Sequence, residues 1–286
     1  MAKRSPGPLV IIGGAEDKTG DQVILREFVR CAGGGRARVA VVTVATRMPE
    51  QVGAHYVEVF HGLGVEHVQA VDIRSREAAH APEVLAALGA ATGIFFTGGD
   101  QLRIISLLGG TAADRCLHER HAAGVVLAGT SAGASAMSTI MIIEGRSEEH
   151  PDLTLIEKGP GLDFMSGVMI DQHFAQRGRL GRLLTAVAQH PGYLGIGIDE
   201  NTAIVVHDDR FQVIGDGAVT IIDASEMSFT NLRALEQERH LALLGVKLHS
   251  LPAGYGFDLQ QRQPLVPEGE GSLPTGDEES SPHAGS

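Results

Sequence analysis

Short apolar runs alternate with amphipathic stretches over the first two hundred residues. The runs are brief, rich in β-branched residues and ended by glycine or polar residues, which is typical of buried strands: residues 9–12, 39–44, 65–71, 93–96 and 125–128. Four segments between them carry apolar residues at helical spacing: residues 21–31, 50–63, 83–88 and 101–108. This alternation predicts an α/β fold with a mostly parallel sheet flanked by helices.

The pattern changes after about residue 192. Closely spaced apolar runs follow, with Asp208-Asp209 and residues 215–217 as turn signals between them: residues 194–198, 203–207, 211–214, 219–222 and a fifth within 241–251. They predict an antiparallel C-terminal meander added to the main sheet. We therefore expect a flexible N-terminus at residues 1–7, a single α/β domain at 8–259, and a disordered acidic tail at 260–286, where Pro, Gly, Ser, Asp and Glu dominate.

Composition narrows the classes of function. The formal net charge is −12 and the aromatic content is 4%, so binding to a nucleic-acid backbone or by base stacking is disfavoured. No apolar run has the length of a membrane span or of a secretory signal, so a cytoplasmic protein without a membrane partner is expected. Cys31 and Cys116 form no metal-ligand spacing, so we expect no metal and no other cofactor.

A G-x-S-x-G segment supplies a candidate nucleophile. Ser131 lies between Gly129 and Gly133, directly after the predicted strand 125–128 and before an apolar run at 134–140 that is expected to be helical. A tight strand-to-helix turn needs small residues on both sides and leaves the serine exposed above the sheet. The N–H of Ala132 would then face an oxyanion.

Two further strand ends supply partners for this serine. Gly99 follows the strand at 93–96 and is expected to provide the second oxyanion-hole N–H. His173 follows a short apolar run at 168–170, so it would lie at the functional edge of the sheet as the general base.

The acid that orients the histidine is less well determined. Glu200 follows the predicted strand 194–198 and is the better candidate. Glu144, Glu148 and Glu149 lie after the serine segment and would give the order serine, acid, histidine; Glu149 stays open as the alternative.

Five segments occur in an order that is specific when taken together. They are Ile-Gly-Gly-Ala-Glu-Asp at 12–17, Thr-Gly-Gly-Asp-Gln at 97–101, Gly-Thr-Ser-Ala-Gly-Ala at 129–134, Asp-Gln-His-Phe at 171–174 and Gly-Ile-Asp-Glu-Asn-Thr-Ala at 197–203. With these segments the chain resembles the serine hydrolase family that contains cyanophycinases and α-aspartyl dipeptidases. The resemblance covers about residues 8–251.

The resemblance implies a sheet like that of class I glutamine amidotransferases, a homodimer and an exopeptidase. The implied substrate is cyanophycin, a polyaspartate with arginine on each β-carboxylate, and the product is β-aspartyl-arginine. An α-aspartyl dipeptidase is the main alternative, and a non-catalytic metabolite-binding protein is a weaker one.

The same resemblance assigns roles to individual residues. It implies Ser131 as nucleophile, His173 as base and Glu200 as acid, with an acid near Glu149 as the other assignment. It also implies a set of substrate-binding residues: Gln101, Asp171, Gln172, Arg177, Arg179 and Arg182. Carboxylate and amide oxygens suit a substrate guanidinium, and arginine forks suit substrate carboxylates; on a helix the last two arginines would share a face.

Overall fold

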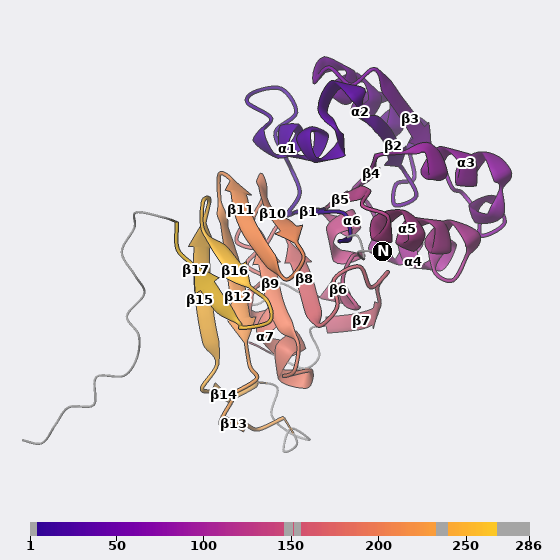
Figure 1. The fold of residues 1–286 in the computed structure, drawn as a ribbon. Helices are drawn as coiled ribbons and strands as arrows, with labels where there is room; N and C mark the ends of the chain where they lie inside the picture. Colours follow the sequence, from indigo (N-terminus) through magenta and orange to yellow (C-terminus); the bar gives the residue numbers. More distant parts are fainter. Residues whose placement is uncertain (1–4, 146–150, 152–155, 233–239, 268–286) are drawn as a thin grey trace, which may run out of the picture.

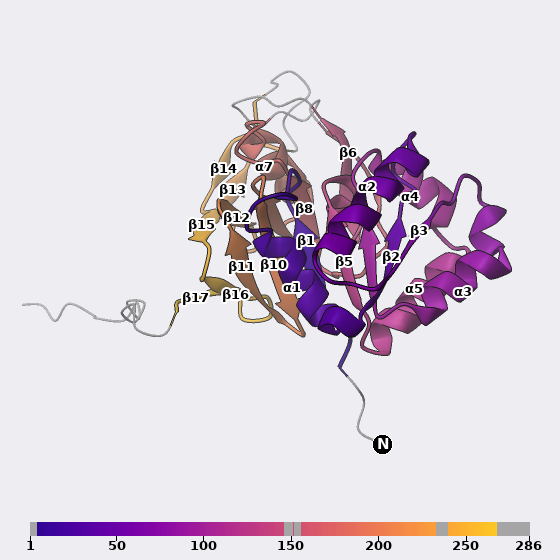
Figure 2. The ribbon, with the colours of Figure 1, turned by 90° about the horizontal axis from the view of Figure 1, so that it is seen from above.

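The chain folds into two main β-sheets that pack together, with helices around them (Figure 1). The structure is a computed structural model that describes residues 5–145, 151, 156–232 and 240–267. The parallel strands and most helices come from the N-terminal half, whereas the strands of the C-terminal half gather on the other side of the molecule (Figure 2).

The main sheet has the order β17-β16-β11-β10-β1-β5-β4-β2-β3 within the described residues. Strands β1, β5, β4, β2 and β3 run parallel, and the remaining four join by antiparallel pairing. The bounds are β1 Leu9–Ile12, β2 Arg38–Val42, β3 His67–Val71, β4 Gly93–Phe96, β5 Val126–Thr130, β10 Thr202–His207, β11 Arg210–Gly215, β16 Gly256–Asp258 and β17 Gln263–Leu265.

Helices cover both faces of the parallel strands because alternate strand residues point to opposite faces. Val10 and Ile12 face a core that includes apolar residues of α1 and α2, whereas Leu9 and Ile11 face a core shared with α3, α4, α5 and the second sheet. The helices are α1 Val23–Ala32, α2 Pro49–Gly62, α3 Pro82–Ala90, α4 Gln101–Leu108, α5 Ala112–Ala122, α6 Ala132–Ser135 and α7 Leu180–Gln189, with 3₁₀ turns at Gly34–Arg36 and Ala78–His80.

The second sheet has the order β15-β12-β9-β8, and α7 packs against it. Its strands are β8 Val168–Gln172, β9 Leu194–Ile198, β12 Ala218–Asp223 and β15 Lys247–Pro252. Only β8 and β9 of this sheet are parallel, so their carboxyl ends lie together. Two short hairpins complete the described chain: β6 Ile140–Gly145 with β7 Ile156–Pro160, and β13 Phe229–Thr230 with β14 Leu243–Leu244.

The predicted α/β class, with a helix-flanked parallel sheet and antiparallel C-terminal strands, is confirmed. Three details of the prediction were wrong. The C-terminal strands do not form one meander, because β9 and β12 belong to the second sheet while β10 and β11 extend the first. The helix expected at 134–140 ends after one turn at Ser135, because Ile140 already begins β6.

The third detail concerns the ends of the domain. Residues 263–265, expected in the tail, form β17 on β16, so the folded part continues past residue 259. Gly7, expected in the flexible N-terminus, donates its N–H to the carbonyl of His121 at 2.8 Å and accepts from the His121 ring at 2.8 Å.

No helix in the described ranges combines the length and the apolar character that crossing a bilayer requires.

Candidate active site

Ser131 occupies a sharp turn between β5 and α6. Its φ of 53° and ψ of −111° are unfavourable for a residue with a side chain, and such a conformation costs about 1–3 kcal/mol. A Cβ on Gly129 would lie 2.4 Å from the carbonyl oxygen of Gly133, and a Cβ on Gly133 would lie 2.7 Å from that of Phe96. Both positions therefore require glycine, because neighbouring backbone lies too close for a Cβ. This is the tight turn that the G-x-S-x-G segment predicts around Ser131.

His173 and Glu200 meet the serine from the second sheet. His173 follows β8, and its Nε2 lies 2.9 Å from the Ser131 hydroxyl. Glu200 follows β9, and its Oε1 lies 2.5 Å from Nδ1 of His173. With the proton on Nδ1 donated to Glu200, Nε2 is left as an acceptor for the serine proton. The structure thus brings the three predicted side chains into one hydrogen-bonded chain, and their catalytic roles stay a prediction.

The end of β1 connects the three segments that carry these side chains. The consecutive carbonyls of Ile12, Gly13 and Gly14 accept the backbone N–H of Ser131 at 3.1 Å, of His173 at 2.7 Å and of Asn201 at 2.9 Å. Asn201 directly follows Glu200. One short stretch of backbone in the main sheet therefore sets the relative positions of groups from β5, β8 and β9.

Gly14 also makes room for the imidazole. Its φ is +101°, and a Cβ there would lie 2.4 Å from Cε1 and 2.5 Å from Nε2 of His173. The histidine ring therefore packs directly on the Gly14 backbone, a contact that no other residue type permits at this φ without displacement.

Further polar residues brace the loops around the histidine. Asp199 accepts the N–H of Ala175 at 3.0 Å and of Ala218 at 3.1 Å, which ties the turn after His173 to β9 and β12. The side-chain oxygen of Asn201 accepts the N–H of Asp17 at 2.8 Å. Sequence reasoning assigned no role to Asp199 or Asn201; their adjacency to Glu200 at a strand end was the only signal.

The predicted oxyanion-hole donors lie beside the serine. Ala132 is the first residue of α6. Within the described residues, the backbone N–H groups of Ala132, Gly98 and Gly99 donate to no protein acceptor. A Cβ on Gly98 would come within 3.4 Å of the Ser131 Cβ, so Gly98 lies against the nucleophile. Gly99, with a φ of +146°, packs on the carbonyl of Ala45. The structure leaves the oxyanion role of Gly99 a prediction and adds Gly98 as a neighbouring donor.

Asp171 does not lie open to a substrate, contrary to the role expected for it. Its carboxylate has no exposed surface. Its Oδ1 is 3.2 Å from Nη1 of Arg179, its Oδ2 accepts from Nε of Arg182 at 2.6 Å, and its Oδ1 also accepts from Nη2 of Arg182. A buried carboxylate is stable only when paired, so it binds these guanidinium groups of its own chain and not that of a ligand.

The two arginines differ in their remaining hydrogen-bonding capacity. Arg179 also donates from Nη1 to the carbonyl of Gln172 at 2.5 Å, yet its buried Nε finds no hydrogen-bond partner among the described residues. Burial lowers the pKa of Arg179 to about 10, which still leaves the guanidinium charged at neutral pH. Both arginines are buried and share Asp171 because Arg179 directly precedes α7 and Arg182 lies in its first turn.

The other predicted substrate-binding residues are placed differently. Gln172 is buried, with its Oε1 3.3 Å from the Ser131 hydroxyl, and Arg177 is exposed just after His173. Gln101 donates from Nε2 to the carbonyls of Ile142 at 3.0 Å and Ile143 at 2.6 Å, where the β6–β7 pairing shifts register. Its amide nitrogen therefore holds β6.

Three other glutamates were alternatives to Glu200 as the acid beside His173. Glu144 lies in β6, not in a loop, opposite Glu157 of β7. Glu148 and Glu149 lie outside the described residues, so the assignment of the acid to Glu149 is not tested.

Burial lowers the pKa of His173 below its usual value near 6.5. The hydrogen bond to Glu200 works in the opposite direction, and the positive charges of Arg177 and Arg179 add to the lowering. The imidazole is therefore neutral at pH 7, as a proton acceptor for serine must be.

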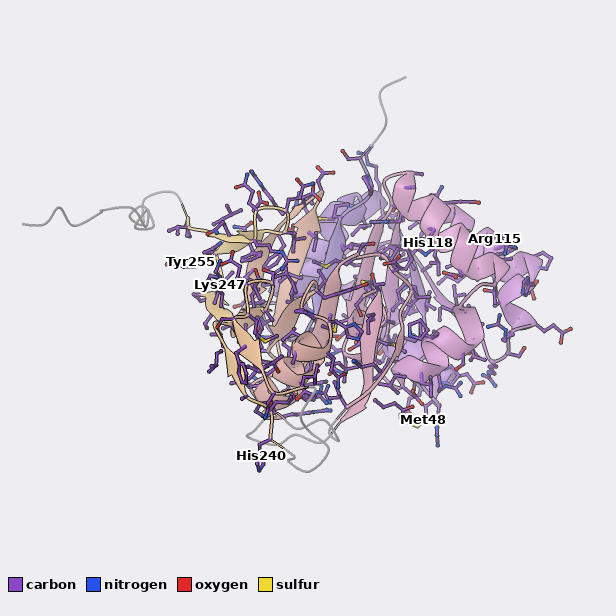
Figure 3. The ribbon with its side chains drawn as sticks, turned by 90° about the horizontal axis from the view of Figure 1, so that it is seen from below. Met48, Arg115, His118, His240, Lys247 and Tyr255 are labelled. Carbon is purple, nitrogen blue, oxygen red and sulfur yellow. The ribbon has the colours of Figure 1, made fainter. Side chains whose placement is uncertain are left out.

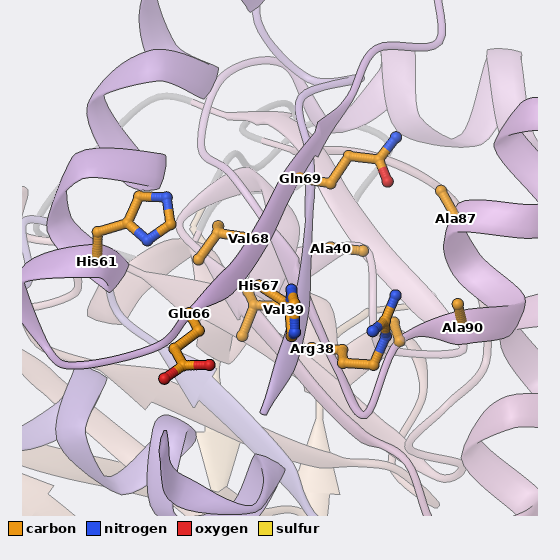
Figure 4. A pocket seen from close by; sticks show the side chains of 11 residues that line it. Arg38, Val39, Ala40, His61, Glu66, His67, Val68, Gln69, Ala87 and Ala90 are labelled. Carbon is orange, nitrogen blue, oxygen red and sulfur yellow. The ribbon is translucent and has the colours of Figure 1, made fainter. Parts of the chain in front are cut away.

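Elsewhere the described residues offer no metal site, and one cavity lies apart from the serine. No cluster of three or more His, Cys, Asp or Glu side chains that would suit a metal ion occurs in those ranges. A cavity of about 280 Å³ opens beside the edge strand β3, lined by Arg38, His61, His67, Gln69, Ala90 and their neighbours (Figure 4). None of the residues lining it is one of the predicted site residues.

Comparison with known proteins identifies the family of this chain. Residues 9–214 match peptidase family S51. The chain is 42% identical over 259 residues to a cyanophycinase of Trichormus variabilis, covering 90% of this chain and 87% of that one. It is 40% identical over 260 residues to a cyanophycinase of Geminocystis herdmanii, covering 90% and 96%.

Two solved structures share the fold. A peptidase from an acI-B1 actinobacterium superposes with a TM-score of 0.63 at 22% identity, covering 90% of this chain and 98% of that one. A putative peptidase E from Listeria monocytogenes gives a TM-score of 0.52 at 17% identity, covering 74% and 100%. From the matched residues and the curated relatives, this chain belongs to peptidase family S51, a family of serine-type peptidases.

Proposed function

We propose that this peptidase degrades cyanophycin to β-aspartyl-arginine dipeptides as a serine exopeptidase. The observation that carries the proposal is the hydrogen-bonded chain from the strained Ser131 through His173 to Glu200. These hydrogen bonds indicate the reaction class. The substrate is inferred from relatives named cyanophycinase, which are about 40% identical over 90% of this protein.

The residues perform acyl transfer in two steps. Nε2 of His173 takes the Ser131 proton as Oγ attacks the scissile carbonyl, and the N–H groups of Ala132 and of Gly98 or Gly99 stabilise the oxyanion. Glu200 holds the imidazole through Nδ1 and stabilises its charged form. His173 then gives its proton to the leaving amine, and a water molecule activated by the same nitrogen hydrolyses the acyl-enzyme.

Substrate recognition is assigned to groups around the serine. Each cyanophycin unit carries one guanidinium and one free α-carboxylate. The exposed Arg177 is a donor suited to a carboxylate, and Gln172 offers an amide beside the serine. The buried Asp171, Arg179 and Arg182 act indirectly in this proposal, through the hydrogen bond from Arg179 to the carbonyl of Gln172.

The test incubates the purified protein with insoluble cyanophycin and identifies soluble products by mass spectrometry. The parent should release β-aspartyl-arginine, and a Ser131→Ala variant should release none. A parent that cleaves α-aspartyl dipeptides and leaves cyanophycin intact would assign the same site to dipeptidase activity. Release of the product by both proteins would show that Ser131 is not the nucleophile.

The pH dependence of the reaction follows from the state of His173. Since the imidazole must be neutral to accept a proton and its pKa is lowered, kcat/KM should fall only below about pH 6.5. Replacing Arg177 with Gln removes one cause of the lowering, so the acidic limb should move to higher pH. Arg115→Gln, on the exposed surface of α5 (Figure 3), is the control and should leave the limb in place.

An acidic limb that does not move, or that moves to lower pH, in Arg177→Gln would contradict this account of the histidine. The position of the limb is the quantity to compare, because Arg177 is also assigned to substrate binding and its loss should lower kcat/KM at every pH.

A homodimer in the cytoplasm belongs to the same proposal, on the family resemblance. Light scattering of the purified protein measures the assembly directly, with twice the mass of the 30.1 kDa chain as the expected value.

A further inference from the structure

Glu16 is a buried carboxylate that the reaction as described does not use. It lies in the loop after β1 and is 3% exposed. Its Oε2 accepts the hydroxyl of Thr130 at 2.5 Å, and its Oε1 accepts the hydroxyl of Tyr56 at 2.5 Å. Nζ of Lys18 lies 2.9 Å from the same Oε1, so the negative charge is paired. Three segments distant in sequence thus meet at one carboxylate: the loop after β1, α2 and the end of β5.

Thr130 connects this carboxylate to the nucleophile. It is the residue immediately before Ser131 and stands opposite Ile12 in the β1–β5 pairing. Ser131 has a positive φ, and such conformations persist only where the surroundings determine them strongly. On the β1 side, two hydrogen bonds supply that constraint: the Ser131 N–H to the Ile12 carbonyl, and the Thr130 hydroxyl to Glu16.

We propose that Glu16 is a positioning residue for the reaction, which holds Thr130 and thereby fixes the direction in which the Ser131 hydroxyl points. Glu16 does not touch the reacting atoms in this role. The inference rests on the proposed function in one respect, namely that Ser131 is the nucleophile.

Tyr56 provides a matched comparison within the same cluster. Burial and the adjacent Glu16 carboxylate raise the pKa of Tyr56, so its hydroxyl keeps its proton and donates. Removing either the Thr130 or the Tyr56 hydroxyl deprives the same buried carboxylate of one donor. Of these two residues, Thr130 is the neighbour of Ser131 in the sequence. Loss of either hydroxyl should therefore lower the stability of the fold to a similar extent, but loss of the Thr130 hydroxyl alone should displace the nucleophile.

The experiment compares Thr130→Val, Thr130→Ser and Tyr56→Phe in the full-length chain. The rate of Ser131 labelling by a fluorophosphonate reports the nucleophile without cyanophycin, and kcat and KM on cyanophycin are measured beside it. Thermal unfolding of each variant is recorded, and rates are taken at a temperature where all variants are folded.

Thr130→Val should lower both the labelling rate and kcat by about 10-fold to 100-fold, with KM within about 2-fold of the parent. Thr130→Ser keeps the hydroxyl and should recover most of the rate. Tyr56→Phe should keep the labelling rate within about 2-fold of the parent, although its unfolding temperature falls by an amount similar to that of Thr130→Val.

Equal losses of rate in Thr130→Val and Tyr56→Phe, or no recovery in Thr130→Ser, would reduce Glu16 to a structural residue. A parent that is labelled at Ser131 but does not release product from cyanophycin fails only the proposed substrate, and the labelling rates still decide the role of Glu16. A parent whose Ser131 resists labelling would overturn both the nucleophile and its positioning residue.

Discussion

Ser131→Ala is expected to lower kcat on cyanophycin by about 10⁵-fold to 10⁶-fold, the largest effect of any single substitution in this chain. The hydroxyl is placed to form the acyl-enzyme, because among the described residues it is the hydrogen-bond partner of Nε2 of His173, at 2.9 Å. KM should change little, since removing one oxygen leaves the surrounding donors in place. The measurement is single-turnover product release, followed by mass spectrometry.

Backbone strain supplies the control for this variant. Alanine at position 131 keeps the unfavourable φ of 53°, whereas glycine adopts it readily. Ser131→Gly should therefore be as inactive as Ser131→Ala but more stable by about 1 kcal/mol in urea unfolding. If Ser131→Ala keeps more than about a hundredth of the parent rate, the acyl-enzyme route is wrong.

Gly14→Ala is expected to lower kcat by at least about 100-fold although position 14 carries no reacting group. The new Cβ would lie 2.4 Å from Cε1 of His173, so the imidazole must move away from Ser131. A displacement of about 1 Å in a reacting group is enough for a loss of this size. The rate of fluorophosphonate labelling at Ser131 should fall with kcat, because both depend on the base.

Gly33→Ala is the matched control for Gly14→Ala. Gly33 also has a positive φ, 113°, but a Cβ there has nothing within 4 Å. It should cost about 1 kcal/mol of stability and leave kcat unchanged. A Gly14→Ala variant that labels and turns over like Gly33→Ala would show that the contact with the histidine ring is not needed.

Each side chain of the candidate triad could be predicted because each follows a strand with a clear apolar pattern. Ser131, His173 and Glu200 come directly after runs that read as strands, and ligand sites of α/β folds lie beyond the carboxyl ends of strands. The sequence pattern predicts a single sheet, whereas β8 and β9 belong to a second one. The three side chains still lie together because the ends of both parallel sets meet at β1.

Asp171 shows where local pattern misleads. A carboxylate two residues before a strand-end histidine reads as a ligand for a cationic substrate. Whether it is exposed or buried depends on how α7 packs on β8, which residues 171–182 do not encode by themselves. The same packing buries Arg179 and Arg182. These arginines therefore form ion pairs with Asp171, although the sequence suggests that all three side chains could bind substrate.

The alternation of apolar and polar positions was enough to predict the α/β class and the parallel strands, and the glycines around Ser131 were enough to predict its turn, because these features depend on residues close in sequence. The hydrogen bonds that join the triad segments to the carbonyls of Ile12, Gly13 and Gly14, and the carboxylate of Glu16 behind Thr130, were decided only by the tertiary structure. Backbone carbonyls carry no residue-specific signal, and these partners lie more than a hundred positions apart. Only the folded chain brings them within hydrogen-bonding distance.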